Sequence, residues 1–173
     1  MLNQAMIGKI IQCHIDDSDP ESFVVGRLVC YDTRWIMMKD LSTSGHWNGI
    51  ALYMRSDIVM VNEATDYLQK ILTLVKCWGE SEPYVPTLSD DLLSNVLQYA
   101  RESGRLIALE LHRSGVRDIT GTIEYLSPNT VLLKQVDEYG FDDGKSYVSI
   151  DAISRCFMDD DELMCLAMLM ACR

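Results

Sequence analysis

The three histidines of this 173-residue chain are the side chains best suited to acid–base chemistry or metal binding. His14 lies in a segment of alternating polarity, as does Glu110, and this pattern predicts that both side chains point outward from a strand into solvent. His46 lies beside Trp47 in a glycine-flanked loop, where packing within the loop is favoured over contact with a ligand. Acid, base and nucleophile do not occur together in a recognisable pattern, so we do not expect an enzyme.

The chain also lacks the residue patterns of metal sites. Neither acidic run, at 16–21 and 159–162, has the alternating ligands and central glycine of a calcium-binding loop. The six cysteines do not show the paired spacing of a zinc site. In a chain of this length they are expected to be reduced thiols. We therefore expect no metal and no cofactor.

The charge and composition of the chain narrow its range of partners. Apolar residues make up 48% of the chain, which is enough for a sizeable core, and the formal net charge is −11. Nucleic acids and anionic membranes are bound largely through Lys and Arg, so this charge disfavours both. The N-terminus shows no basic leader, and no apolar run approaches the ~18 residues of a membrane span. These features predict a cytoplasmic protein.

The chain carries the same pattern twice. Three glycines in the first half align without a gap with three in the second: Gly26, Gly45 and Gly49 with Gly121, Gly140 and Gly144. The apolar run WIMMK aligns with TVLLK in the same frame, which indicates an internal repeat. Each copy predicts five short strands separated by turn-forming residues. Because glycine inside a strand often marks a bend, Gly26 and Gly121 are expected to curl each sheet into a small barrel.

Helical patterns flank the strands. Residues 65–78 have apolar side chains at helical spacing, with Thr65 as the expected N-cap. The equivalent residues of the second copy, 160–173, begin with carboxylates that suit the positive end of a helix. A further helix is expected between Ser89, as its N-cap, and Gly104, just beyond its end.

The boundary between the copies is expected in the linker at 79–87, which contains two prolines and two glutamates. This division places one domain at 1–78, a barrel with its following helix. The second domain, at 88–173, has helices before and after its barrel.

A helix followed by five short strands, with a glycine in the second, resembles the Sm-like fold of the LSm and Hfq-type family. In that family's first motif a glycine is followed by an aspartate, an apolar run and a lysine. Here these are Gly26, Asp32, residues 35–38 and Lys39. The family's second motif is similar to YMRSDIVMV at 53–61. The resemblance implies a small five-stranded barrel in each copy, although another SH3-like barrel would show much the same pattern.

The second copy departs from the family pattern. It keeps Gly121 and Lys134, but has Ser127 where the motif has aspartate. Hfq-type proteins carry a Lys-His pair facing the central pore, and this copy has Ile150 and Asp151 in that place. Because an aspartate there would repel phosphate, the resemblance implies the fold more strongly than it implies RNA binding.

The resemblance also points to residues that could contact RNA or another ligand. These are Asp32, Arg34, Trp35, Lys39, Arg55, Asn129 and Lys134. A tryptophan can stack on a base, and an arginine can hold a phosphate. The alternative for Trp35 is that it begins the next strand and packs inward.

We therefore predict a mainly β protein with flanking helices, built as two tandem Sm-like (SH3-like) five-stranded barrels. The favoured function is a non-catalytic binding or assembly module that contacts protein, and the alternative is an RNA-binding post-transcriptional regulator of the Hfq kind. Because small barrels leave strand edges that seek partners, self-association into a ring or a dimer is expected. A further protein partner is expected as well, whereas RNA is disfavoured by charge and a membrane is not expected.

Overall fold

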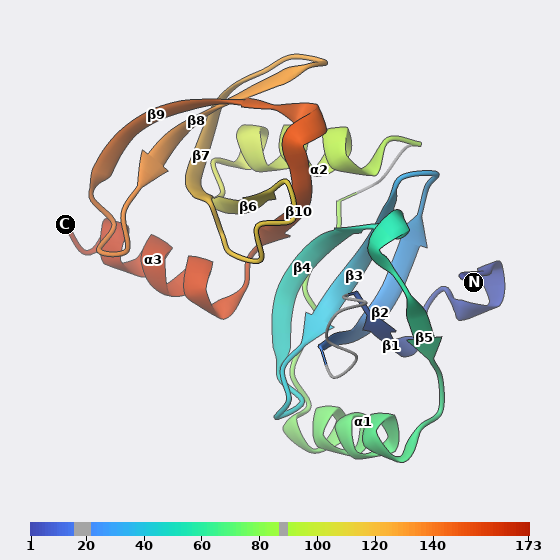
Figure 1. The fold of residues 1–173 in the computed structure, drawn as a ribbon. Coiled ribbons are helices and arrows are strands. Elements are labelled where there is room, and N and C mark those ends of the chain that lie inside the picture. Colours follow the sequence, from blue (N-terminus) through green and yellow to red (C-terminus); the bar gives the residue numbers. More distant parts are fainter. Residues whose placement is uncertain (16–21, 87–89) are drawn as a thin grey trace. The chain divides into compact units, whose positions relative to one another are not determined.

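The computed structural model describes residues 1–15, 22–86 and 90–173 (Figure 1). The chain divides into two compact units, Met1–Val85 and Pro86–Arg173. Each unit contains five antiparallel strands with flanking helices, so the prediction of a mainly β protein with flanking helices is confirmed. The acidic run at 16–21 lies outside the described residues.

The first unit is a curved sheet with the strand order β5-β1-β2-β3-β4. Its strands are β1 (Ile10–His14), β2 (Phe23–Tyr31), β3 (Trp35–Leu41), β4 (Trp47–Met54) and β5 (Met60–Asn62). Its helices are the 3-10 turns η1 (Gln4–Met6) and η2 (Arg55–Asp57), and the α-helix α1 (Asp66–Trp78). The turn η2 connects β4 to the short last strand.

The second unit repeats this arrangement with the strand order β10-β6-β7-β8-β9. Its strands are β6 (Ile107–Leu111), β7 (Ile119–Leu126), β8 (Thr130–Val136), β9 (Asp142–Ser149) and β10 (Ile153–Met158). Its helices are α2 (Leu92–Ser103), the 3-10 turn η3 (Ile150–Ala152) and α3 (Asp161–Ala171). In both units the last strand pairs with the first, and a 3-10 turn leads into it.

The prediction of two closed barrels is wrong, because the sheet of each unit is open. Among the described residues, β4 does not pair with β5, and β9 does not pair with β10. A closed barrel needs its outermost strands to meet along their length. The 3-10 turn instead delivers the last strand to the first strand, and in the first unit only Met60–Asn62 form that strand.

Gly26 and Gly121 lie where two strands come very close together. A Cβ atom at either glycine would collide with the main-chain oxygen of Lys39 or Lys134 on the neighbouring strand. The pairing then shifts register a few residues further along, between Leu28 and Cys30 in the first unit and between Ile123 and Tyr125 in the second. A bulge of this kind bends a strand.

The two copies also make the same turn. The main-chain N–H of Asp32 donates to the carbonyl of Trp35 at 3.0 Å, and Ser127 donates to Thr130 at 2.9 Å. The repeat seen in the sequence is therefore a repeat of hydrogen-bonded geometry.

The helices begin where side chains satisfy their first free N–H groups. Thr65 caps α1 as predicted, accepting from the N–H of Leu68. Asp160 caps α3 in the same way, accepting from the N–H of Leu163. The predicted cap Ser89 lies outside the described residues, and α2 is capped by Asp91.

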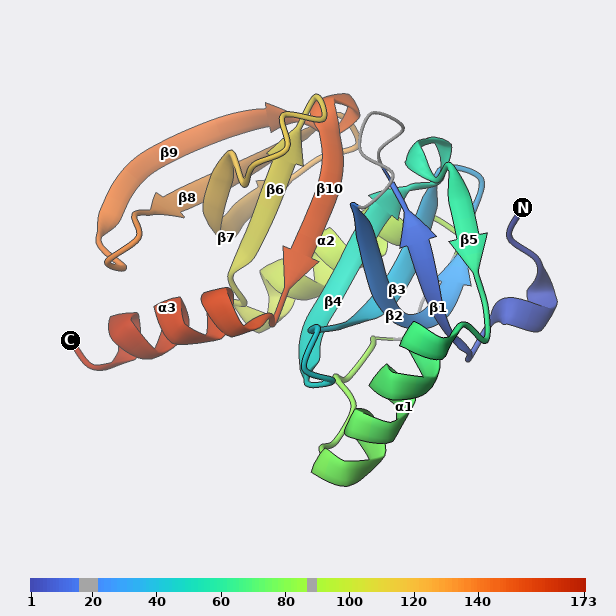
Figure 2. The same cartoon turned by 60° about the horizontal axis from the view of Figure 1, so that its bottom comes forward.

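In each unit the helix that follows the last strand packs against the curved sheet (Figure 2), and in the second unit α2 also packs against β7. Leu68 and Ile71 of α1 pack with four buried residues of the first sheet, namely Ile10, Val25, Leu41 and Trp47. Leu163 and Leu166 of α3 pack with Leu106 and Ala108. None of the helices in the described part of the chain is long and apolar enough to cross a membrane.

Candidate functional site

Several of the predicted contact residues meet at the turn between β2 and β3. The carboxylate of Asp32 accepts hydrogen bonds from the main-chain N–H groups of Arg34 at 2.7 Å and Trp35 at 2.6 Å. Arg55 donates from Nη1 to the main-chain oxygen of Asp32 at 3.1 Å, and its guanidinium carbon lies 5.0 Å from the ring centre of Tyr31. Asp32 therefore serves to close the turn, and Arg55 braces it.

Trp35 is not presented to a ligand. Its side chain is only 2% exposed, which confirms the alternative that it packs inward. The guanidinium carbon of Arg34 lies 5.5 Å from the centre of the indole ring. A nucleic acid base could not stack on this ring unless the strand moved.

The remaining predicted residues lie elsewhere, and their cations are paired. Lys39 lies further along β3, with Nζ at 2.9 Å from Glu82 Oε2. In the second unit, Lys134 lies 3.1 Å from Asp142, and the main-chain oxygen of Asn129 accepts from the N–H of Ile150. Lys39 is thus engaged away from the β2–β3 turn, and Lys134 and Asn129 are engaged within the second unit.

Glu82 belongs to a segment that the sequence marked only as a linker, and its side chain bridges two cations. We refer to residues Gly79–Val85 as the strap. Oε1 of Glu82 lies 2.9 Å from Arg27 Nη2, and Oε2 lies 2.9 Å from Lys39 Nζ. Partial burial acts to raise the pKa of Glu82, but Lys39 and Arg27 outweigh it and the pKa lies below its ordinary value.

Glu80 fixes the beginning of the strap. His46 donates from Nδ1 to Glu80 Oε1 at 2.7 Å, and the N–H of Trp47 donates to Oε2 at 3.3 Å. The hydrogen bond from His46 holds the pKa of Glu80 below its ordinary value. The His46 ring also lies against Trp78, with ring centres 4.3 Å apart. The loop around His46 and the buried Trp47 is therefore packed, as the favoured reading of the sequence proposed.

The prediction that His14 points into solvent is wrong. Its side chain is 6% exposed, and its Nε2 lies 3.0 Å from the amide nitrogen of Gln12 and 3.2 Å from that of Asn62. All five residues of β1 are buried, so this strand has no solvent face. The alternating residues of β1 therefore point to two faces of the curved sheet, and both faces are buried.

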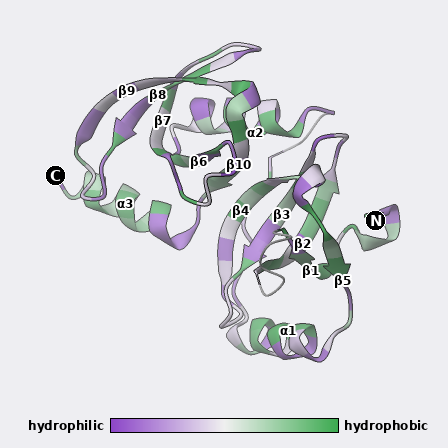
Figure 3. Ribbon diagram, viewed as in Figure 1, coloured by the Kyte–Doolittle hydropathy of each residue, from purple (hydrophilic) through white to green (hydrophobic). Residues whose placement is uncertain are grey.

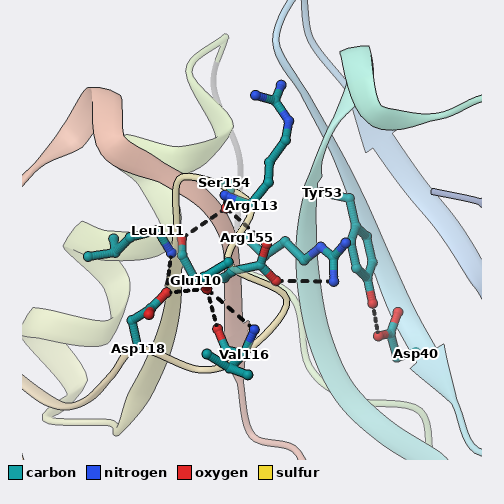
Figure 4. A network of polar contacts seen from close by, with 10 residues as sticks. Asp40, Tyr53, Glu110, Leu111, Arg113, Val116, Asp118, Ser154 and Arg155 are labelled. Atoms are coloured by element: carbon teal, nitrogen blue, oxygen red, sulfur yellow. Dashed lines mark hydrogen bonds and ion pairs between the residues drawn. The ribbon is translucent and has the colours of Figure 1, made fainter. Parts of the chain in front are cut away.

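The prediction that Glu110 of the second unit points into solvent is also wrong, because this residue is only 2% exposed. It accepts from Ser154 Oγ at 3.1 Å and lies 3.1 Å from Arg155 Nη1 (Figure 4). Ser154 in turn accepts from the N–H of Arg113 at 3.0 Å. Buried charges are tolerated when they are paired and hydrogen-bonded, so this network joins β6 to β10 as part of the core.

The clearest difference between the two copies lies on the outer faces of α1 and α3. The inward residues match, since Leu68 and Ile71 of α1 are replaced by Leu163 and Leu166 of α3. The outward positions do not match: Gln69, Lys70, Thr73 and Lys76 of α1 are replaced by Met164, Cys165, Met168 and Ala171 of α3. Figure 3 shows α3 as more uniformly hydrophobic than α1.

The outer face of α3 exposes apolar side chains to solvent. Met164 is 48% exposed, Met168 65% and Leu169 47%. We call Met164, Cys165, Met168 and Leu169 the α3 surface. The apolar run of this helix is too short for a membrane span. Comparison with residues 66–78 of the first copy would have revealed its unusual outer face.

Grooves flank the α3 surface on both sides. One groove, of about 460 Å³, is lined by apolar residues of α3 and by the Arg105–Asp159 ion pair, whose atoms lie 2.5 Å apart. The other, of about 420 Å³, is lined by three carboxylates and three apolar or sulfur-containing side chains: Glu138, Asp161, Glu162, Cys165, Leu166 and Leu169. The α3 surface is therefore an apolar ridge with an acidic border.

No family model, curated protein or solved structure matches this chain. The two copies within the chain can still be compared with each other. In that comparison the inward residues of α1 and α3 agree, and most of their outward residues differ.

Proposed function

We propose that this chain is a non-catalytic protein-binding module of tandem Sm-like type, and that it binds its partner at the α3 surface. Support for the Sm-like relation comes from the strand order of each unit, from Gly26 and Gly121 in the second strands, and from the 3-10 turn before each last strand. The observation that carries the binding function is the apolar outer face of α3.

The fold alone does not require that face. Amphipathic helices on a protein surface normally keep polar residues outward, and α1 does so. Exposed apolar side chains that gather in one patch mark interaction sites. Methionine suits such a surface because its unbranched side chain adapts to the shape of a partner. Covering Met164, Met168 and Leu169 would remove apolar area from water, which favours binding by about 25 cal/mol per Å².

The acidic border of the α3 surface indicates which charge the partner carries. Glu138, Asp161 and Glu162 line the groove beside Cys165 and Leu169. A partner that places Lys or Arg beside apolar anchors complements this charge. An amphipathic helix with basic flanks has that arrangement, and helices commonly bind in apolar grooves of this kind.

The alternative function, an RNA-binding regulator of the Hfq kind, is less favoured. The cations at the family's contact positions are engaged within the chain, as Lys39 is with Glu82 and Lys134 is with Asp142. Phosphate binding would have to break these pairs in a chain of net charge −11. Trp35, the residue that could stack on a base, is buried.

Self-association is a second candidate, and β9 favours it. Within the described residues this eight-residue strand pairs only with β8, and Tyr147 on it is 76% exposed. An unpaired strand edge is a template for another strand. A ring of three chains or a dimer would cover such edges. Light scattering that gives a monomer mass at micromolar concentration would remove this candidate and leave the α3 proposal intact.

A peptide titration tests the leading proposal. The probe is a labelled amphipathic peptide of about five helical turns, with Leu on one face and Lys on its flanks. We expect Met164→Gln with Met168→Thr, which copies α1 without changing charge, to weaken binding at least about tenfold. The matched control, Gln69→Ala with Thr73→Ala on α1, should leave binding unchanged. Equal binding by all three proteins would overturn the proposal.

A further inference from the structure

We propose that the sheet of the first unit carries a binding site for an extended acidic peptide, and that the strap Gly79–Val85 occupies this site in the structure. The proposal is independent of the α3 surface, which belongs to the other unit. It rests on how the side chains of Glu80 and Glu82 are held by residues of the sheet.

The first half of the site is a pair of cations. Arg27 of β2 and Lys39 of β3 are direct cross-strand partners, so their side chains lie on the same face of the sheet. Like charges in that arrangement repel, and Glu82 lies between them at 2.9 Å from each. The fold does not demand the pair, because Thr122 replaces Arg27 in the second copy. Arg27 is therefore an addition of the first copy, and together with Lys39 it favours the binding of an anion.

The second half of the site binds another carboxylate through His46 and the main-chain N–H of Trp47. Glu80 and Glu82 are two residues apart, and alternate side chains of an extended chain point to the same side. The site therefore selects a Glu-x-Glu spacing. One carboxylate meets Arg27 and Lys39, and the other meets an imidazole and a main-chain donor.

The strap fits this site incompletely. Within the described residues, Nε of Arg27 is buried without a hydrogen-bond partner, although Nη2 of the same guanidinium lies 2.9 Å from Glu82. Buried donors are nearly always satisfied, and leaving one unsatisfied costs free energy. The ion pairs that hold the strap are partly exposed, and such pairs add little to stability. A competing acidic segment that also accepts from Nε of Arg27 would be preferred over the strap.

Tethering explains how the strap can hold the site in spite of weak contacts. A segment of the same chain has a high effective concentration at its own site, so a free peptide competes poorly. Removing the strap carboxylates should therefore open the site. The experiment uses the full chain with Glu80→Gln and Glu82→Gln, and a labelled free peptide of the strap sequence GESEPYV as the probe.

We expect this strap variant to bind the peptide at least about tenfold more tightly than the parent chain does. The matched control is Glu63→Gln with Glu102→Gln, which changes the net charge equally at exposed residues outside the strap. Adding Arg27→Thr, the residue of the second copy, to the strap variant should abolish binding. A peptide with Gln in place of both glutamates should bind to none of these proteins.

Three results would overturn the proposal. An equal gain in peptide affinity in the strap variant and in the control would show that net charge alone causes the effect. No binding to a strap variant that melts like the parent would show that there is no site. Tighter binding of a single-stranded oligouridylate than of the peptide would assign the site to nucleic acid instead. If the strap variant does not fold, the single variant Glu82→Gln serves in its place, because it frees Arg27 and Lys39 for the peptide while Glu80 stays on His46.

Discussion

Met168 of α3 and Thr73 of α1 occupy the same position in the two copies, and both side chains are exposed. Each lies two residues after a buried residue of the inward face, Leu166 or Ile71. The two copies thus have a helix at the same place in the fold. Its outer face is polar in α1 and apolar in α3. The inward residues Leu163 and Leu166 pack in the core, whereas the outer face of α3 is exposed.

The first prediction separates the two faces of α3. Met164→Gln with Met168→Thr should change the free energy of unfolding by less than about 1 kcal/mol, because neither side chain packs in the core. Leu166→Ala, on the inward face, should cost about 2–4 kcal/mol. Urea unfolding measures both. A large loss in the double variant would mean that the α3 surface stabilises the unit itself.

The second prediction concerns the glycines at the close strand contacts. Alanine normally stabilises a strand relative to glycine, but at Gly26 and Gly121 even a Cβ would meet the main-chain oxygen across the ladder. Gly26→Ala and Gly121→Ala should therefore each destabilise their unit, and the corresponding valine variants should lose a few kcal/mol. In thermal melting, the melting temperature should fall from glycine to alanine to valine at each position. Variants that melt like the parent would refute the close approach.

Much of this architecture follows from the sequence. The repeat, the two strand glycines and the Thr65 cap are local signals, since each depends on residues close together in the chain or on a fixed offset. Sheet closure is not local, and the expected closed barrels proved to be open sheets. The outward placement of His14 and Glu110 failed for a related reason: alternation shows that a strand has two faces, but not that one of them meets water.

The candidate sites were harder to predict than the fold. The strap is composed like a linker, and only tertiary contacts reveal that Glu82 neutralises Arg27 and Lys39. The α3 surface left a signal in the sequence, but its meaning depends on knowing which face of the helix packs inward. Asp32 and Trp35 are among the predicted contact residues, but Asp32 closes a turn and Trp35 packs in the core.

The third prediction concerns the buried Glu110–Arg155 pair. Glu110 is almost fully buried, whereas the Arg155 side chain is 22% exposed and can reach water. Arg155→Met should therefore destabilise the second unit more than Glu110→Gln does, because it leaves a buried carboxylate uncompensated. Losing the partner of a buried charge costs about 3–5 kcal/mol. Unfolding curves of the two variants give the comparison. A larger loss of stability in Glu110→Gln would show that the free-energy cost of removing charge from water is greater for Arg155 than for Glu110.

The fourth prediction is a pH dependence of the strap. The pKa values of Glu80 and Glu82 are lowered from an ordinary value of 4.5. Their contribution to strap docking is therefore complete above that pH and is lost as the pH falls through the lowered values. Fluorescence of Trp47 and Trp78 should change on acidification below pH 4.5. The variant with Gln at both positions should show the released signal already at neutral pH; an identical acid transition in that variant would exclude the strap as its cause.

The central claim is that a partner covers the α3 surface, and the methionine methyl groups report on it directly. The chain has ten methionines, of which Met37 and Met38 are fully buried in the first unit while Met164 and Met168 are exposed on α3. With their methyl groups labelled with ¹³C, the basic amphipathic peptide can be titrated and each resonance followed by NMR. We expect the resonances of Met164 and Met168 to shift with saturation, and those of Met37 and Met38 to stay in place. Binding of the peptide without any shift of Met164 and Met168 would contradict the claim.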